Sequence, residues 1–253
     1  MTAYERVTAA RDKKRATSLD LINGIFNDFL EMHGDRRFAD DKAIVAGIAY
    51  LENMPVTVIG IEKGHSVRER SFRNFGSSHP EGYRKALRQM KLAEKFGRPV
   101  ICFIDTSGAY CGIGAEERGQ GQAIAENLME MMTLRSPIIS IIVGEGGSGG
   151  ALGLAVANEV WMLENSTYSV ISPEGCASIL WKDSLMAEQA AECLKLTAED
   201  LINLKVIDKI IAENDLLVDA LRLQLVAALR EYKAMSVDEL TKQRYFRFRA
   251  IGV

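Results

Sequence analysis

The feature that most constrains this chain is a run of glycines over residues 144–150, Gly-Glu-Gly-Gly-Ser-Gly-Gly. The β-branched residues of 138–143 predict a buried strand before it, and the small residues of 151–157 predict a helix after it. Glycines let other atoms approach the backbone closely, and the first turn of a helix leaves N–H groups without partners. The sequence therefore predicts a strand, a glycine turn and a helix that together bind an anion or an oxyanion.

Three motif templates fit this run, and the residues alone do not choose among them. The spacing G-x-G-x-x-G over residues 144–149 matches the dinucleotide fingerprint, with Glu164 standing 20 residues after the first glycine. The spacing G-x-S-x-G over residues 146–150 matches the nucleophile elbow of α/β-hydrolases. The same glycines also suit an oxyanion hole without side-chain chemistry, or simply the close packing of a helix on a sheet.

The positions of the histidines argue against the hydrolase template. The chain has only His33, His65 and His79, and all three precede Ser148, whereas the usual order in α/β-hydrolases places the histidine last. An order of His65, Asp105 and Ser148 stays formally open. An NAD-binding oxidoreductase remains the alternative function, although it leaves the second glycine loop and the basic stretch described below without a role.

Composition limits the class of protein. A chain of 253 residues with 47% hydrophobic residues suits an α/β protein with a sizeable core. Its net charge of −3 argues against nucleic-acid binding by charge. The four cysteines form no C-x-x-C pair, which indicates reduced thiols in the cytosol and argues against a zinc site. No apolar run reaches transmembrane length, so we expect a cytoplasmic protein without bound metal.

Strand-like and helix-like segments alternate along the chain, which is typical of a wound α/β fold. Residues 1–16 are charged and are expected to be peripheral, and Thr17 or Ser18 is expected to cap a helix that Gly34 ends. Runs 43–51 and 56–62 predict a β-hairpin. Further strands are expected at 100–105, 160–163, 168–171 and 206–212, and further helices at about 80–96, 122–134, 215–233 and 237–248.

A second glycine-rich loop, residues 106–121, also follows a predicted strand and precedes a predicted helix. Loops that follow successive parallel strands lie at the same edge of a sheet, where α/β folds bind ligands. Gly108 and Ala109 of this loop are therefore candidate binding residues.

Residues 63–98 form a basic stretch, with ten lysines or arginines against three acidic residues. Arg68, Arg70 and Arg73 are expected in a loop before the Asn-Phe-Gly turn of 74–76, because no apolar periodicity assigns them to a core-facing helix. Such a loop indicates contact with an anion or with another subunit.

Several longer motifs resemble the alpha subunit of bacterial acetyl-CoA carboxylase carboxyltransferase over nearly the whole chain. They are Asn-Phe-Gly at 74–76, Pro-Glu-Gly-Tyr-Arg-Lys-Ala-Leu-Arg at 80–88, Gly-Ala-Glu-Glu-Arg-Gly-Gln at 114–120, Gly-Glu-Gly-Gly-Ser-Gly-Gly-Ala-Leu at 144–152 and Ser-Pro-Glu-Gly-Cys-Ala-Ser-Ile-Leu-Trp-Lys at 172–182. The resemblance implies an α/β fold of the crotonase type, built from repeated ββα units. It implies one carboxyltransferase alpha domain over 1–253, with a core at about 40–212 and peripheral helices at about 17–33 and 215–248.

The resemblance also implies an activity and partners. The reaction moves a carboxyl group from carboxybiotin, delivered on the biotin carboxyl carrier protein, to acetyl-CoA and gives malonyl-CoA for fatty acid synthesis. The alpha subunit works with a beta subunit in an α2β2 heterotetramer, beside a separate biotin carboxylase, and binds no cofactor directly. In the family the alpha subunit cradles biotin, which assigns the amides of Gly149 and Gly150 to the biotin oxyanion. Gly146, Gly147 and Ser148 would shape the approach, and Arg68, Arg70 and Arg73 would meet the phosphates of CoA or an acidic face of the carrier.

Overall fold

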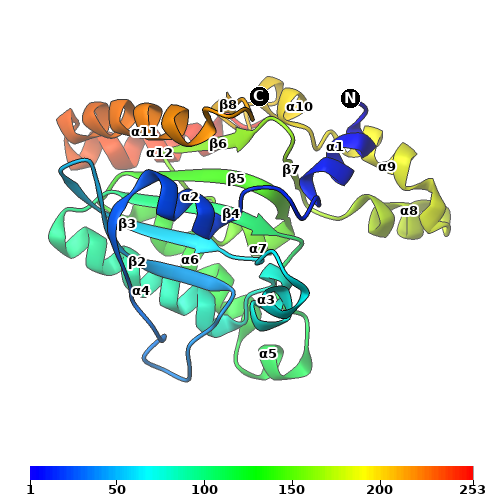
Figure 1. Cartoon of the computed structure of the whole chain (residues 1–253), viewed down its shortest axis with the longest axis horizontal. Coiled ribbons are helices and arrows are strands. Elements are labelled where there is room, and N and C mark those ends of the chain that lie inside the picture. The colour runs from blue at the N-terminus through cyan, green and yellow to red at the C-terminus, as the bar shows by residue number, and fades with distance from the viewer. Residues whose placement is uncertain (253) are drawn as a thin grey trace.

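The computed structural model describes residues 1–252, in which eight strands form one mixed sheet surrounded by helices (Figure 1). The strands are β1 (Asn27–Glu31), β2 (Ile44–Leu51), β3 (Met54–Ile61), β4 (Val100–Thr106), β5 (Ile138–Gly147), β6 (Glu159–Leu163), β7 (Thr167–Ser169) and β8 (Lys209–Ile211). The helices are α1 (Ala3–Ala10), α2 (Ser18–Ile25), α3 (Val67–Phe72), α4 (Pro80–Phe96), α5 (Ile113–Glu117), α6 (Gln120–Thr133), α7 (Ser148–Leu152), α8 (Pro173–Trp181), α9 (Ala187–Leu194), α10 (Ala198–Asn203), α11 (Leu217–Ala234) and α12 (Val237–Arg249).

The sheet has an antiparallel part and a parallel part. Its strand order is β1-β2-β3-β4-β5-β6-β8; β1, β2 and β3 pair antiparallel, and the pairs from β3 to β8 are parallel. β7 lies off this path and pairs with the last residues of β5, 145–147. The carboxyl ends of β4 and β5, and the two glycine-rich loops that follow them, therefore lie at one edge of the sheet, as the sequence predicts.

Two hydrophobic clusters, one on each face of the sheet, form the core. α2 and α11 cover one face and contribute Leu21, Ile22, Leu225 and Leu229, which are at most 1% exposed. α4 and α6 cover the other face together with α10, where residues 86, 90, 93 and 131 of the two long helices are completely buried. Figure 1 shows α11 and α12 at one side of the molecule, with α8, α9 and α1 projecting at the carboxyl edge of the sheet.

The hairpin and most of the helices confirm the sequence predictions. β2 and β3 pair in continuous register from Ile44↔Ile61 to Leu51↔Met54. The turn between them is tighter than the sequence predicts, because Met54 and Pro55 already belong to β3. α4 begins with Pro80 at its first turn and ends at Gly97, whose φ of 64° is the left-handed conformation that glycine adopts without strain.

The helix predicted over residues 17–33 is wrong in its second half. Thr17 caps α2 through a capping box with Asp20, but α2 ends at Ile25 and the chain continues as the edge strand β1. β1 pairs with β2, and this ladder gives hydrogen-bond partners to backbone groups along the outer edge of β2. The approach is close: a Cβ built on Gly47 would lie 2.1 Å from the Leu30 carbonyl oxygen.

Residues 1–16 also differ from the prediction, because they are anchored to the fold and are not merely peripheral. Ala3 and Val7 of α1 are buried against α9 and the segment before α10. Arg15 donates a hydrogen bond to the Val143 carbonyl oxygen and pairs with Glu213 at 2.5 Å. The amino-terminal segment thus lies directly against the strand that carries the glycines.

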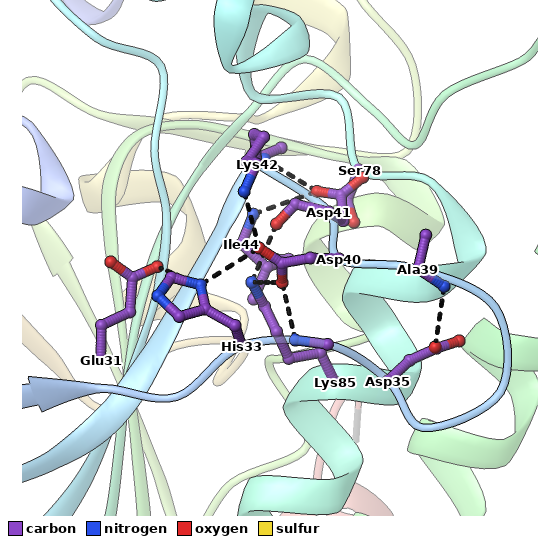
Figure 2. Close-up of polar contacts among 12 residues, drawn as sticks. Glu31, His33, Asp35, Ala39, Asp40, Asp41, Lys42, Ile44, Ser78 and Lys85 are labelled. Carbon is purple, nitrogen blue, oxygen red and sulfur yellow. Dashed lines mark hydrogen bonds and ion pairs between the residues drawn. The ribbon is translucent and has the colours of Figure 1, made fainter.

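The loop between β1 and β2 is fastened to α4 by a cluster of charges (Figure 2). The ammonium of Lys85 is completely buried and lies 2.7 Å from the Asp40 carboxylate. Figure 2 shows Asp40 also facing His33 and Lys42, and the ring of His33 lies 3.1 Å from the Asp40 carboxylate. The Asp40 carboxylate accepts the backbone amide of Gly34, and the Asp41 carboxylate accepts the backbone amide of Ala43. Opposite charges and amide donors therefore compensate the burial of these carboxylates.

A buried arginine fastens the carboxyl-terminal helix α12. The Arg244 guanidinium is fully buried and donates to the carbonyl oxygens of Met131, Leu134 and Ser136, at and just beyond the end of α6. Burial lowers the pKa of Arg244 to about 10. Within residues 1–252, no helix has the length and apolar character needed to span a membrane.

Candidate active site

The glycine run begins as strand and becomes helix only at Ser148. Gly144 to Gly147 belong to β5, where Gly146 pairs with Thr106 of β4 on one side and with Tyr168 of β7 on the other. The sequence prediction of a glycine turn over this stretch is therefore wrong in detail, because both flanking strands continue the ladder. The chain turns at Ser148, whose φ of 51° places a non-glycine residue in the left-handed region, at a typical cost of about 1–3 kcal/mol.

The second glycine loop packs directly on the first. A Cβ built on Gly147 would lie 2.2 Å from the Ser107 carbonyl oxygen, and one built on Gly150 would lie 2.4 Å from the Ala109 amide nitrogen. Gly108, in turn, is fixed by Thr106, whose hydroxyl accepts its amide at 3.0 Å. These contacts require glycine at positions 147 and 150. They also bring the candidate binding residues Gly108 and Ala109 next to the start of α7.

Gly149 has a different environment. The nearest atoms to a Cβ built there belong to the Ile124 side chain, at 3.9 Å, which is an ordinary contact distance. The amides of Gly149 and Gly150 belong to the first turn of α7, and within residues 1–252 neither donates to another segment of the chain. Neither amide therefore has a partner in another described segment; Gly149 is partly exposed, whereas Gly150 is buried.

Side chains from three elements hold α7 in place. The hydroxyl of Tyr83 in α4 donates to the Gly150 carbonyl oxygen at 3.1 Å, and the Asn127 amide in α6 donates to the Gly153 carbonyl oxygen at 3.0 Å. Ser140 of β5 donates to Leu154 at 2.6 Å. The sequence did not single out these residues, which fix the carbonyl groups of the turn and so the direction of its free amides.

A buried group of charges lies behind the glycine strand, and the sequence reasoning missed it. The ammonium of Lys63 lies 2.7 Å from Asp105 and 2.9 Å from Glu145, and Arg11 reaches Glu145 at 2.7 Å from the other side. Asp105 also accepts the Glu145 amide at 2.9 Å. A signal was present in the sequence: Lys63 stands just after a predicted strand, Asp105 is the last residue of another, and Glu145 stands among the glycines.

The pKa of Glu145 follows from two opposing effects. Burial raises this pKa, but the charge of Lys63, together with Arg11 and their hydrogen bonds, outweighs burial and holds it below its ordinary value. For Lys63, burial lowers the pKa, while the charges of Asp105 and Glu145 outweigh burial and raise it. Glu145 and Lys63 are therefore both ionised at neutral pH, and their charges are used within the fold.

The geometry does not assemble the hydrolase template. His65 lies 2.7 Å from Asp20, and its other ring nitrogen lies 3.2 Å from the Lys13 carbonyl oxygen. Asp105 is occupied by Lys63 and an amide, so the order His65, Asp105, Ser148 does not form a triad.

The dinucleotide template is not supported either. Its first glycines, 144 to 147, lie inside β5 and do not form a strand-to-helix turn. The Glu164 carboxylate, which the template needs for a ribose hydroxyl, accepts the amide of Glu213 at 2.7 Å.

The three arginines of the basic stretch lie at a helix, which corrects the predicted loop. Ser66 caps α3 through a capping box with Glu69, so Arg68 and Arg70 lie within the helix and Arg73 follows it. No residue of α3 is buried, and the guanidinium of Arg70 lies 5.8 Å from the exposed ring of Phe75. The structure thus brings these arginines together at one short helix, where Arg68 is exposed and Arg70 and Arg73 are partly buried. Among residues 1–252 no group of three or more His, Cys, Asp or Glu side chains is arranged to hold a metal ion.

Comparison with known proteins gives a family match over the described chain. Residues 1–252 match the family model described as acetyl co-enzyme A carboxylase carboxyltransferase-like. An acetyl-coenzyme A carboxylase carboxyl transferase subunit alpha from Ruminiclostridium cellulolyticum is 63% identical over 100% of this chain and 99% of its own length. A protein of the same name from Clostridium acetobutylicum is 56% identical over 100% of this chain and 95% of its own length.

Solved structures share the fold at low sequence identity. The transcarboxylase 12S crystal structure, with methylmalonyl-coenzyme A and methylmalonic acid bound, superposes with a TM-score of 0.72 at 18% identity. The alignment covers 89% of this chain and 44% of the transcarboxylase chain. A Pseudomonas malonate decarboxylase hetero-tetramer in complex with coenzyme A gives a TM-score of 0.70 at 17% identity, over 90% of this chain and 92% of that chain. These likenesses establish the crotonase-type carboxyltransferase fold.

Proposed function

This chain belongs to the acetyl-CoA carboxylase carboxyltransferase alpha family. We propose that its α7 turn binds biotin, while a second subunit binds acetyl-CoA. The family match over the whole described chain carries this proposal. The protein is a carboxyl transferase of acetyl-CoA carboxylase. Carboxybiotin, delivered on the biotin carboxyl carrier protein, supplies the carboxyl group that acetyl-CoA receives to give malonyl-CoA.

The residues of the turn suit the ureido oxygen of biotin. We expect the amides of Gly149 and Gly150 to donate to this oxygen, where negative charge gathers during transfer. Fixed donors about 2.7–3.1 Å from such an oxygen are typically worth about 2.7–4 kcal/mol each. Three features support this assignment: the free amides, the space beside Gly149, and the side chains of Tyr83 and Asn127 that keep the turn rigid.

A second set of donors is needed for the thioester oxygen of acetyl-CoA, and one turn does not serve two oxygens. We therefore propose that the beta subunit supplies the other half of the site, in an α2β2 heterotetramer. Exposed apolar side chains on and beside α8 support a partner here: Val170, Ile179, Leu180 and Leu185 are 61–88% exposed. α8 begins next to the glycine strand, because Ser172 and Pro173 line the same small cavity as Gly146 and Gly147.

Reconstitution tests the divided site. We expect this chain alone to form no malonyl-CoA, and activity to appear when the matching beta subunit is added. Full activity of the isolated chain would refute the division. Leu185→Asp should prevent co-elution with the beta subunit in size-exclusion chromatography, whereas Leu223→Asp, at an exposed position on α11, should not. Equal co-elution of both variants would place the interface elsewhere.

A further inference from the structure

The motif at residues 114–120 has no role in the site described above, and the structure fastens it to the motif at residues 80–88. The carboxylate of Glu81 in α4 pairs with the guanidinium of Arg118, and Arg84 donates to the Arg118 carbonyl oxygen at 3.0 Å. The Glu81 side chain is only 4% exposed, so little water competes with this pairing. The chain is therefore fixed to α4 just before α6 begins.

Gln120, the last residue of the 114–120 motif, is buried and bridges two backbone carbonyl groups. Its side-chain Nε2 donates to the Ser78 carbonyl oxygen at 2.8 Å and to the Tyr110 carbonyl oxygen at 2.9 Å. The Ser78 carbonyl oxygen also accepts the Tyr110 amide at 3.0 Å, so both backbone groups of Tyr110 are held. The Gln120 Oε1 accepts from no described residue. The side chain therefore serves only as a donor of two hydrogen bonds, which a primary amide supplies from one uncharged nitrogen.

The segment to which Gln120 ties Tyr110 is itself fixed. Ser78 is completely buried, and the Asp41 carboxylate accepts the next amide along the chain, that of His79, at 2.9 Å. The ring of His79 stacks on the ring of Tyr110, with 4.1 Å between the ring centroids. Tyr110 is therefore held by its backbone and by its ring against a buried part of the molecule.

Tyr110 directly follows the loop residues that pack on the glycine strand. The Ser107 carbonyl oxygen would lie 2.2 Å from a Cβ built on Gly147, and the Ala109 amide nitrogen would lie 2.4 Å from one built on Gly150. Contacts this close leave the loop and the start of α7 no space to move independently, because closely packed interiors transmit strain. The position of Tyr110 therefore determines how the loop packs against α7.

We propose that Gln120 is a positioning residue for carboxyl transfer. It holds the loop of residues 107–110 against the start of α7 and so fixes the direction of the Gly149 and Gly150 amides. This role rests on the proposed function, in which these amides donate to biotin. Gln120 is 4% exposed and both of its N–H donors are used within the fold, so it acts through the loop and does not touch the substrate.

Gln120→Glu tests this role with little change of shape, because it removes both donors and keeps the length of the side chain. In the complex assembled with the beta subunit, kcat for malonyl-CoA formation should fall at least about tenfold, since misplaced catalytic groups are costly. The KM for acetyl-CoA should stay within about twofold of wild type, because the thioester half of the site is unchanged. Gln120→Met also lacks both donors but adds no buried charge, so it should show the same fall and keeps the test valid if Gln120→Glu does not fold.

Two control variants separate this role from a general effect on charge or stability. Gln122→Glu makes the same chemical change at an exposed position of α6 and should keep wild-type turnover. Val226→Ala removes buried volume from the core cluster on the face of the sheet opposite α4, so it should lower the melting temperature. Its turnover should match wild type at temperatures where both proteins are folded.

Amide hydrogen exchange of the chain without its partner gives a measurement that does not depend on activity. Exchange of the Tyr110 amide should become at least about tenfold faster in Gln120→Glu and Gln120→Met, because the loop opens locally more often. Gln122→Glu should exchange as wild type.

The outcomes distinguish a failure of this role from a failure of the proposed function. Wild-type kcat in both Gln120 variants would overturn the role of Gln120, whether or not the Tyr110 amide exchanges faster. An equal fall of kcat in Val226→Ala would also overturn it, because the effect would then follow stability alone. Absence of malonyl-CoA formation by the wild-type complex would overturn the proposed function, and this role with it.

Discussion

The ammonium of Lys63 lies 2.7 Å from the Asp105 carboxylate, and the two side chains are 10% and 13% exposed. Lys63 follows β3 and Asp105 lies in β4, so the pair joins two neighbouring strands at the edge where the glycine loops lie. Asp105 in turn accepts the amide of Glu145. The position of the glycine strand therefore depends on a buried ion pair that joins the end of β3 to β4.

Lys63→Met should destabilise the chain by about 3–5 kcal/mol, because removing one partner of a buried pair leaves the other charge uncompensated. Urea unfolding followed by circular dichroism measures the free energy. Lys95→Met, on the exposed side of α4, is the control and should change stability by at most about 0.5 kcal/mol. Wild-type stability of Lys63→Met would show that the pair contributes nothing.

The lowered pKa of Glu145 predicts a loss of stability in acid. A carboxyl whose pKa is lower in the folded state stabilises the fold above its ordinary value of 4.5, and this contribution is lost as the pH falls through the folded-state pKa. Glu145→Gln should therefore lose less free energy of unfolding between about pH 5 and about pH 3 than wild type does. Parallel pH profiles for the two proteins would contradict this assignment.

Gly149 and Gly150 should respond differently to an added side chain. Gly149→Val should keep the fold, since only Ile124 is near, and should lower turnover of the assembled complex at least about tenfold by intruding on bound biotin. Gly150→Ala should destabilise the chain by about 1–3 kcal/mol, because its Cβ meets the Ala109 backbone. Thermal unfolding and malonyl-CoA formation separate the two effects. Unaltered turnover of Gly149→Val would remove Gly149 from the site.

Ser148→Ala should leave turnover within about tenfold of wild type, because no histidine lies in reach to activate the hydroxyl. Steady-state kinetics of the assembled complex is the measurement. A loss of about 10⁴-fold would instead be the signature of a missing nucleophile and would restore the hydrolase-like interpretation.

Replacing Arg68, Arg70 and Arg73 together with Ala should raise the apparent KM for acetyl-CoA or for the carrier protein and weaken its dependence on ionic strength. Exposed charges act mainly on association, so kcat should stay nearly unchanged. Arg68→Ala alone is the cleanest single change, because Arg73 also donates to the Lys42 carbonyl oxygen. A fall in kcat at saturating substrates would assign these arginines to catalysis.

The sequence by itself determined most of the strands and helices, the meeting of the two glycine loops and the family. Each of these rests on local patterns: β-branched runs, glycines after strands, Thr17 at a helix start and Pro80 and Gly97 at the ends of α4. The prediction from sequence was wrong where a local pattern was compatible with both a helix and a strand. Residues 26–31 carry apolar residues at helical spacing, but in the fold this segment pairs with β2 across Gly47, which gives backbone partners to both strands.

Only the tertiary structure decided which charges are buried and which glycines are free. Lys63, Asp105 and Glu145 come from three segments, and their pairing depends on strand neighbours that periodicity does not encode. Gly149 and Gly150 are identical in sequence terms, yet one faces Ile124 at contact distance and the other faces the backbone of Ala109. Sequence patterns report which face of an element is apolar, whereas contacts between distant segments follow from how the elements pack.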